Sequence, residues 1–500
     1  MSYILVIDTG SSSMRGVLFD QQGNMCFTEQ KYYSMYTVGD TAEYDPIDFS
    51  NCLSSICSAC AAWSMEKKDV IEAISFTSQR SSILPVKADG TPLTKIMTWY
   101  DKRASMISEN MNANHGELLY SLAGMKASPI FSAPKIAWLK LNRREIYDAA
   151  YKIIGIQDFL IYLCTGRFVT DTSLASRSHL MNVHERIWDK TLLSLYDIDI
   201  EKLADLVAPC SIVGHITSSF AEKTGLTAGT PVIAGGGDQQ CSVLGQGILH
   251  SGACGLTCGS GSYLAAVSDF PILDKEMRVN VNAAITPGQW IIEVNSLSSG
   301  TVQDWLNRTF YQKEKDQTYP LERLHMEASS SPAGANGLIM LPDLAGKGCP
   351  DWNDQARGSF LNINFSHTRS DFARAMLEGL ASEITECYDV LASLLPEIRT
   401  LCITGGVTRC ELFNQLIADM IDYPIYQCNN METTAIGAYL AALYGLKKYD
   451  TFEDAYASLP HTSPQKLYHP NADAVTIYKK INSYRRRLYD ALATCRQQEL

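Results

Sequence analysis

The stretch YILVIDTGSSSMRGVLFD, residues 3–20, carries the pattern that decides the fold. An apolar run over 3–7 is followed by a turn of glycine and hydroxyl residues over 8–13, and strand-forming residues return over 14–20 before the turn at Gly23. Short apolar runs bounded by turn residues predict strands. We therefore predict a strand, a turn, a second strand, a second turn and a third strand.

A similar pattern returns near the middle of the chain. Two further apolar runs flank a second turn of glycine and hydroxyl residues, and a third run ends in three glycines and an aspartate. A strand, such a turn and a second strand recur about half a chain apart, which indicates a structural duplication. We place the boundary near Gly245 and expect two domains, residues 1–245 and 246–500. The stretches are 232–234 with 235–238, and 253–257 with 258–261 and 263–267.

Strands and helices alternate along the rest of the chain, which predicts the α/β class. The predicted helices cover about 46–68, most of 105–141 with a break at Ser128, 411–421 and 432–446. The predicted strands cover 70–77, 401–404 and 424–426.

Composition and charge limit the classes of protein that remain. The 500 residues carry 42 Lys and Arg against 54 Asp and Glu, a formal net charge of −12, with 46% hydrophobic residues. An acidic surface repels phosphate backbones and anionic lipid headgroups. We interpret the densest basic run, Arg485 to Arg487, as a solvated helix face. Neither nucleic acid nor a membrane is therefore expected as a partner.

The N-terminus and the cysteines predict a cytoplasmic protein. No apolar stretch approaches the roughly 20 residues that span a bilayer, and the N-terminal apolar run lacks a basic leader. The 15 cysteines are then expected to be reduced thiols. We interpret Cys57 and Cys60 as core thiols, because no second Cys or His pair stands at zinc-site spacing. His179 and His184 are interpreted as loop or surface residues.

The turn over residues 8–13 has the groups that phosphate chemistry needs. Asp8 stands at the end of the predicted strand, and backbone N–H groups and hydroxyls follow it. Backbone amides in a tight turn form an anion-binding concavity, and a nearby carboxylate holds Mg²⁺ directly or through water. Arg15 lies within reach. Turns of this composition are also common between strands, so a structural role is an alternative.

Asp238 is the candidate general base. The three preceding glycines let the backbone approach a ligand closely while one carboxylate is presented. A sugar hydroxyl is too weak an acid to be deprotonated in advance by an aspartate with a pKa of about 4, so the proton moves as the bond to phosphorus forms. Position therefore matters more than basicity. A simple turn is the alternative interpretation.

Five motifs stand in the order typical of the FGGY carbohydrate kinases, and the chain resembles that family over most of its length. The motifs are residues 8–15, 131–139, 158–176, 235–239 and 405–406. The resemblance implies an actin-like fold of two domains, each a ribonuclease-H-like α/β core, with a catalytic cleft between them. It also implies ATP and Mg²⁺ as cofactors and a small sugar or polyol as substrate. Many relatives are dimers, so a homodimer is an open expectation.

The resemblance further implies residue roles. Asp238 is implied to be the base and a substrate contact, and Asp8 to organise the metal ion. The implied nucleotide contacts are Ser11, Ser12, Arg15, Ser260, Gly300, Gly405 and Gly406. The implied substrate contacts are Gln79, Arg80, Trp99, Asp101 and Gln239.

The identity of the acceptor is left open by the sequence. Gln79-Arg80 departs from the Met-His of xylulokinase-like and gluconokinase-like members; glycerol kinases share Gln-Arg, but Ser81 and Ile130 depart from their pattern. The segment 274–288 resembles autoinducer-2 kinases, whose ligand is a linear dihydroxy-dione. We expect phosphoryl transfer from ATP to a hydroxyl of a small sugar, for example a ketose. A non-enzymatic actin-like ATP-binding protein is the alternative from another class.

Overall fold

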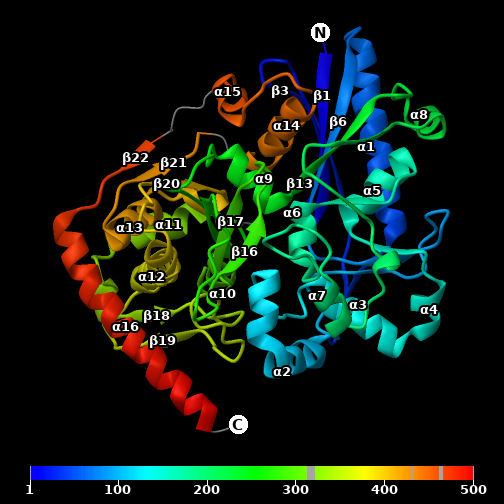
Figure 1. Ribbon diagram of the computed structural model, residues 1–500. Coiled ribbons are helices and arrows are strands. Elements are labelled where there is room, and N and C mark those ends of the chain that lie inside the picture. Colours follow the sequence, from blue (N-terminus) through cyan, green and yellow to red (C-terminus); the bar gives the residue numbers. More distant parts are fainter. Residues whose placement is uncertain (1, 312–320, 430–431, 461–465, 499–500) are drawn as a thin grey trace.

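Two large mixed sheets form the centre of the molecule (Figure 1). The computed structural model describes residues 2–311, 321–429, 432–460 and 466–498. The first sheet consists, in spatial order, of β12 (Ile212–His215), β13 (Pro231–Gly237), β6 (Val70–Ser78), β1 (Ser2–Thr9), β2 (Ser13–Phe19) and β3 (Met25–Tyr32). The second consists of β22 (Lys466–Tyr468), β21 (Ile425–Gln427), β20 (Thr400–Thr404), β14 (Ala253–Cys258), β15 (Ser262–Ser268), β17 (Trp290–Ser296) and β16 (Asn280–Ala283).

The two sheets repeat one arrangement. β1 pairs antiparallel with β2 and parallel with β6, and β13 continues parallel on β6. In the second sheet β14 pairs antiparallel with β15 and parallel with β20, and β21 continues parallel on β20. An antiparallel strand, β12 or β22, then adds to β13 or β21. The duplication predicted from the two strand-turn-strand patterns is present in this strand pairing.

Both faces of the first sheet are covered, which explains the unbroken apolar run of β1. Leu5 and Ile7 belong to the core formed with α1 (Pro46–Glu66) and α5 (Ile156–Thr165). Ile4 and Val6 point to the opposite face, as alternation along a strand requires, and pack with α14 (Thr433–Gly445). A helix from the last third of the chain therefore completes the core of the first sheet.

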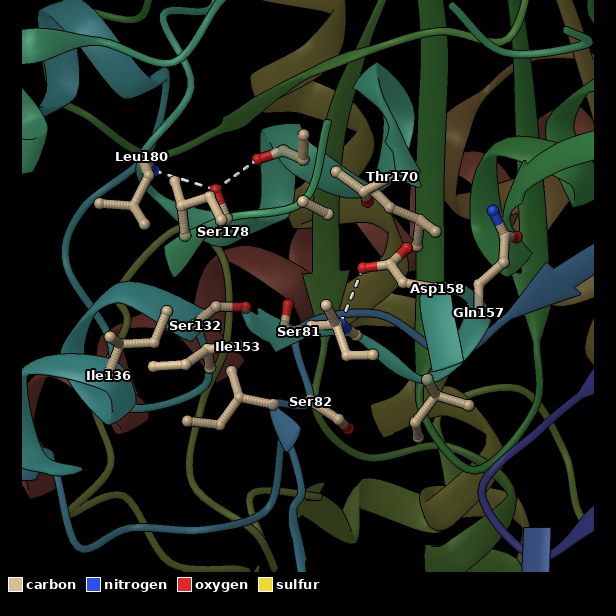
Figure 2. A pocket seen from close by; sticks show the side chains of 18 of the residues that line it. Ser81, Ser82, Ser132, Ile136, Ile153, Gln157, Asp158, Thr170, Ser178 and Leu180 are labelled. Atoms are coloured by element: carbon tan, nitrogen blue, oxygen red, sulfur yellow. Dashed lines mark hydrogen bonds between the residues drawn. The ribbon is translucent and has the colours of Figure 1, made fainter. Parts of the chain in front are cut away.

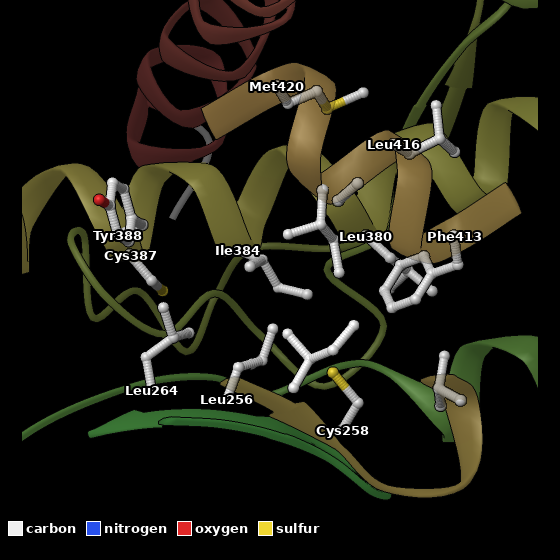
Figure 3. Close-up of a cluster of buried hydrophobic side chains, with 14 of the residues drawn as sticks. Leu256, Cys258, Leu264, Leu380, Ile384, Cys387, Tyr388, Phe413, Leu416 and Met420 are labelled. Atoms are coloured by element: carbon white, nitrogen blue, oxygen red, sulfur yellow. The ribbon is translucent and has the colours of Figure 1, made fainter. Parts of the chain in front are cut away.

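The second sheet is covered by α12 (Arg369–Leu394) and α13 (Glu411–Ile421). Figure 3 shows Leu256 and Leu264 of the sheet facing Leu380 and Ile384 of α12, with Phe413 of α13 beside them. The sequence predicted α13 but not α12. Most of the middle of α12 is buried all round, so it lacks the one-sided apolar pattern from which a helix is predicted.

Helix α9 (Asp238–Gly245) lies against α14 at very close range. A Cβ atom on Gly245 would lie 1.9 Å from the carbonyl oxygen of Thr433, and one on Gly437 would lie 1.9 Å from that of Cys241. Only glycine permits such an approach between backbones. This contact joins the helix that starts at the candidate base to the helix that covers the first sheet.

The predicted helix over 105–141 is two helices, α2 (Ser105–Ala123) and α3 (Ser132–Asn142), and the predicted break lies between them.

Smaller helices are α4 (Arg144–Ala149), α6 (Thr172–Ala175), α7 (Lys190–Leu195), α8 (Ser218–Thr224), α10 (Gly300–Phe310), α11 (Leu321–Ser330) and α15 (Phe452–Ala457). The long helix α16 (Ala472–Gln498) runs along the outside of the second sheet's layer (Figure 1). Short strands pair as β4 (Tyr36–Val38), β5 (Thr41–Tyr44) and β8 (Ile96–Met97); β7 (Leu84–Val86) and β9 (Lys152–Ile154); β10 (Val169–Asp171) and β11 (Asp205–Val207); and β18 (Ile339–Leu341) and β19 (Ser359–Leu361).

The solvated helix face predicted for the basic run was wrong for Arg485, whereas His179 lies in a turn, as predicted, but is not on the surface. Arg485, the first residue of the basic run, is buried at 3% exposure in α16, and Arg486 forms an ion pair with Asp351. His179 is fully buried and hydrogen-bonded to Tyr196 and to the backbone of Met125. Both ring nitrogens of His179 thus have partners, whereas Arg485 donates from Nη1 to Asn482 and its other two guanidinium nitrogens are buried without a hydrogen-bond partner. Local sequence reveals neither burial.

The cysteines are free thiols, as the sequence predicts. All 15 cysteines lie in the described ranges as thiols without disulfides, and Cys57 and Cys60 are buried in α1. Burial raises the pKa of the Cys60 thiol to about 12. Within the described ranges, no helix combines the length and the apolar character that crossing a bilayer requires.

Candidate active site

Asp8 and Arg15 face each other across the first hairpin. They are directly paired residues of β1 and β2, and Arg15 donates to the Asp8 carboxylate at 2.8 Å. The other side of the guanidinium contacts Glu432 at 2.6 Å. Burial raises the pKa of Asp8 above its ordinary value, although Arg15 acts in the opposite direction. Arg15 keeps a side-chain exposure of 28%, so it is presented to a ligand while fixed by two carboxylates.

Two tyrosines donate hydrogen bonds to the backbone of the turn between β1 and β2. Tyr33 donates to the carbonyl oxygens of Gly10 and Ser13, and Tyr44 donates to that of Ser11 at 2.6 Å. Ser11 and Ser12 themselves are exposed. Because the carbonyl oxygens are bound by tyrosine hydroxyls, the turn is fixed with its two serines facing solvent.

Asp238 is the first residue of α9, directly after β13. Arg80 lies 3.4 Å from its carboxylate, and the backbone N–H of Gln239 donates to it at 2.7 Å. Its pKa is raised to about 6, chiefly by burial; Arg80 and the Gln239 N–H lower it, and the charges of Asp8 and Glu293 raise it. The side chain is nevertheless 25% exposed. An accessible carboxylate with a pKa near neutrality suits a general base.

Arg80 is held by a carboxylate of the second sheet. Its Nη1 lies 2.9 Å from Glu293 of β17, whose other oxygen accepts from Arg177 at 3.2 Å. All three side chains are nearly inaccessible. Burial would raise the pKa of Glu293, but Arg80 and Arg177 outweigh it and hold this pKa below its ordinary value. The sequence analysis missed Glu293 and Arg177; a lone acid inside the apolar strand WIIEVNS was the one available signal.

The strand end that carries Asp238 is fixed by Asp171 and Ser173. The Asp171 carboxylate accepts from the Ser173 hydroxyl and from Gln157. Ser173 Oγ in turn accepts from the backbone N–H of Gly237 at 3.0 Å, and its carbonyl accepts from Gln240 at 3.0 Å. The Asp171-x-Ser173 motif therefore contacts the residue immediately before the candidate base.

Of the other predicted substrate contacts, Gln79 and Asp101 are hydrogen-bonded to the protein's own groups, whereas Gln239 and Trp99 are partly exposed. Gln79 donates to the carbonyl of Gly10 at 2.9 Å and so links the segment after β6 to the β1–β2 turn. The carboxylate of Asp101 is buried and accepts from Ala42 N–H and from Arg103. Asp101 thus contacts the protein's own groups, whereas Gln239 lies beside Asp238.

The predicted nucleotide contacts of the second sheet gather at the β14–β15 turn. The carbonyls of Gly259 and Ser260 accept from the N–H groups of Gly300 and Ser299, which attaches this turn to the start of α10. Gly405 has φ +105°, and a Cβ there would lie 2.2 Å from the Cys258 carbonyl oxygen. Beside Gly406, in contrast, a Cβ would meet no atom within 4 Å.

A cavity of about 50 Å³ lies behind the Gln79 to Ser82 segment (Figure 2). Asp158 faces it and accepts from the backbone N–H of Gly155 at 2.8 Å. Burial raises the pKa of Asp158 to about 7. Asp158 Oδ1 and Ser82 Oγ are buried without a protein partner. This volume has room for water but not for a sugar, so the cavity itself is not the site of a sugar.

Comparison with known proteins defines the class of protein first. The xylulose kinase structure from Lactobacillus acidophilus superposes with a TM-score of 0.91 at 27% identity, covering 99% of each chain. Gluconokinase of Bacillus subtilis is 29% identical over 90% of this chain and 89% of its own length. Xylulose kinase of Staphylococcus epidermidis is 27% identical over 97% and 96%. The fold is thus that of the sugar kinases with two actin-like domains.

The family itself is shown by two matches that together span most of the chain. The N-terminal domain of the FGGY family of carbohydrate kinases matches residues 3–245, and its C-terminal domain matches residues 254–446. The chain belongs to the FGGY family of carbohydrate kinases and is a sugar kinase that uses ATP. The predictions of family, fold class and enzyme class are confirmed.

Proposed function

We propose that Asp238 is the general base by which this kinase transfers the γ-phosphoryl group of ATP to a sugar hydroxyl. The observation that carries the proposal is the position of Asp238 at the start of α9, 3.4 Å from Arg80 and within electrostatic range of Asp8. Asp238 accepts the hydroxyl proton as the bond to phosphorus forms. Arg80 and Gln239 orient the acceptor.

The two hairpin turns are the proposed nucleotide contacts. Ser11, Ser12 and Arg15 offer hydroxyls and a cation from the first sheet, and Ser260 with Gly406 offers an exposed hydroxyl and open backbone from the second. Phosphate groups are bound by such amides, hydroxyls and guanidinium groups. In this proposal residues 1–245 and 246–500 are the two domains, and ATP lies between their turns.

Asp8 has the chemistry to hold Mg²⁺. Within the described ranges, no group of three or more His, Cys, Asp or Glu side chains forms a metal site. Magnesium in kinases needs only one or two carboxylates, because water and substrate phosphates complete its shell. The carboxylate of Asp8, beside the exposed serine turn, fits this requirement. When bound, Mg²⁺ supplies positive charge that offsets the phosphate oxygens.

Replacement of the base tests the proposal. Asp238→Asn is expected to fold normally and to lower acceptor-dependent ADP production by about 10²–10⁴-fold. The acceptor panel is D-xylulose, D-ribulose, hexoses, glycerol, D-gluconate and dihydroxypentanedione. Asp351→Asn, which removes a carboxylate paired with Arg486 of α16 and assigned no part in the reaction, is the control and keeps its activity. Near-normal turnover by Asp238→Asn would remove Asp238 from its role.

The pH profile gives an independent test. The base must be deprotonated, and its pKa is raised to about 6. We therefore expect kcat/KM to fall about tenfold per pH unit below pH 6 and to be level just above it. An acid limb near pH 4 would show an unperturbed carboxyl group. ATP turnover that is indifferent to every acceptor would favour the non-enzymatic actin-like class instead.

A further inference from the structure

Glu293 joins the two halves of the molecule at the acceptor side. It projects from β17 of the second sheet, whereas its partners Arg80 and Arg177 follow β6 and α6 of the first half. The two ion-pair distances are 2.9 Å and 3.2 Å, and the exposed fractions of the three side chains are 3% for Glu293, 7% for Arg80 and 10% for Arg177. The proposed phosphoryl transfer assigns Glu293 no part.

The charges of this cluster balance. Arg80 and Arg177 contribute two positive charges, and Glu293 and Asp238 contribute two negative charges within contact distance. Burial and the charge of Arg80 lower the pKa of Arg177 to about 10, so Arg177 stays protonated at neutral pH. Both arginines are therefore neutralised by carboxylates of the protein before any substrate binds.

Three further cations among the residues that the structure describes, Arg15, Arg103 and Lys135, also have acceptors of their own. Arg15 contacts Asp8 and Glu432, and Arg103 contacts Asp101 and Glu43. Lys135 is fully buried and donates to three backbone carbonyls, those of Ser81, Ile130 and Phe131. An ammonium group has three N–H donors, so Lys135 has none left for a ligand.

We propose that Glu293 is a specificity-determining residue, which restricts the acceptor to uncharged sugars or polyols and rejects sugar acids. The inference rests on the proposed kinase function. A sugar carboxylate at this site would lie close to Asp238 and Glu293 and would add an unbalanced negative charge to a cluster that is already neutral. Burying a charge without a compensating partner is strongly unfavourable. Neutral hydroxyls leave the charge balance unchanged.

Removing the charge of Glu293 should admit a sugar acid. In Glu293→Gln the guanidinium of Arg177 loses its carboxylate, and the cluster gains one net positive charge. We expect the ratio of kcat/KM for D-gluconate to that for the best neutral acceptor to rise at least tenfold. The double variant Glu293→Gln/Arg177→Met restores neutrality and should return this ratio to the parent value. Glu293→Asp keeps the charge and should keep the ratio.

A pH measurement separates this role from a purely structural one. The charge of Glu293 raises the pKa of Asp238, so its removal lowers that pKa. The acid limb of the kcat/KM profile of Glu293→Gln should therefore move to lower pH. Glu378→Gln is the matched control, because Glu378 is an equally buried carboxylate that contacts Arg374 at 2.9 Å within α12. It should change neither the ratio nor the limb.

Binding measurements make the test independent of turnover. Thermal-shift titration with D-gluconate and with its uncharged analogue D-glucitol reports binding to parent and variants even without phosphoryl transfer. Gluconate binding that appears in Glu293→Gln and disappears in the double variant supports the inference. A parent protein that prefers gluconate, or a Glu293→Gln variant that binds gluconate no better than the parent, overturns it. Absence of acceptor-dependent ADP production in the parent would count against the kinase proposal alone.

Discussion

The first hairpin turns of the two sheets share one strand pairing but carry different chemistry. The β1–β2 turn is bounded by the ion pair of Asp8 and Arg15. The β14–β15 turn is bounded by Cys258 and Ser262, whose thiol and hydroxyl lie 3.5 Å apart and carry no charge. The two copies of the scaffold thus differ in charge: the first carries an ion pair, and the second carries a neutral thiol and hydroxyl.

This difference indicates a division of labour between the halves. Asp8, Arg80 and Asp238 all stand at the carboxyl ends of strands of the first sheet or in the residues that follow them. The second sheet offers Ser260 and Gly406 at its turns, and Glu293 as a charged side chain. Substitutions at the charged turn should therefore impair the chemical step, and substitutions at the neutral turn should impair nucleotide binding or folding.

The largest effect is expected at the charged turn. Asp8→Asn removes the carboxylate proposed to hold Mg²⁺, and metal charge stabilisation is worth several kcal/mol, so kcat should fall by roughly 10³-fold. Steady-state kinetics at saturating ATP and Mg²⁺ measure it. A loss below tenfold, in protein with parental circular dichroism, would place the metal elsewhere.

At the second sheet, Gly405 and Gly406 should respond in opposite ways. Gly405 has φ +105° and ψ +167°, a region open essentially to glycine alone, and its Cβ would meet the Cys258 carbonyl at 2.2 Å. Gly405→Ala should cost about 2–3 kcal/mol of unfolding free energy. Gly406→Ala should fold, because its methyl group meets no protein atom. It should raise KM for ATP a few-fold, because the methyl group enters the space proposed for the nucleotide. Denaturant titration and ATP kinetics measure the pair; equal stability of both variants would contradict the steric account.

Next in size is the loss of the hydrogen bond that fixes the base. Ser173→Ala leaves the N–H of Gly237 without its acceptor, and an unsatisfied buried donor costs about 1–2 kcal/mol of free energy. Because Gly237 precedes the proposed base, we expect kcat to fall about tenfold while KM for ATP is unchanged. Ser178→Ala is a suitable control, because Ser178 bonds to the backbone of Ala175 and Leu180 instead. A change confined to KM for ATP would refute the positioning role.

The smallest effect is expected from Ser260→Ala in the neutral turn. One hydrogen bond to phosphate is lost while the backbone donors remain, so KM for ATP should rise about threefold at constant kcat. Isothermal titration with ADP provides the same comparison without turnover. If this variant lost as much kcat as Asp8→Asn, the proposed division between the two turns would be wrong.

Local patterns predicted most strands of the two sheets and three of the helices that cover them, α1, α13 and α14, but not the strands β12, β16, β17 and β22 or the helix α12. Residues 3–20 gave a hairpin because apolar runs and turn residues are adjacent in the chain, and β14 with β15 follow the same pattern. Asp8 and Asp238 could be selected because each ends an apolar run. Their proposed roles stay predictions, since geometry shows position but not turnover.

Contacts between distant residues were beyond local patterns. Arg80 and Glu293 are separated by 213 residues, and Ser173 and Gly237 by 64. No periodicity links such pairs, because they are brought together only after both sheets have formed. The start of α9 at Asp238 was missed for a related reason: three glycines predict a turn, whereas the packing of α9 against α14 favours a helix.

The packing of α14 on the first sheet also bears on biosynthesis. Ile4, Val6, Val17 and Phe19 belong to a core that includes a helix near the end of the chain. While the ribosome is still translating residues 246–432, that face of the sheet lacks α14 and is covered only in part, by α9, and exposed apolar strands favour aggregation. A fragment ending at residue 245 would have the same defect permanently. Chaperone demand during translation and poor solubility of such a fragment follow from the placement of this one helix.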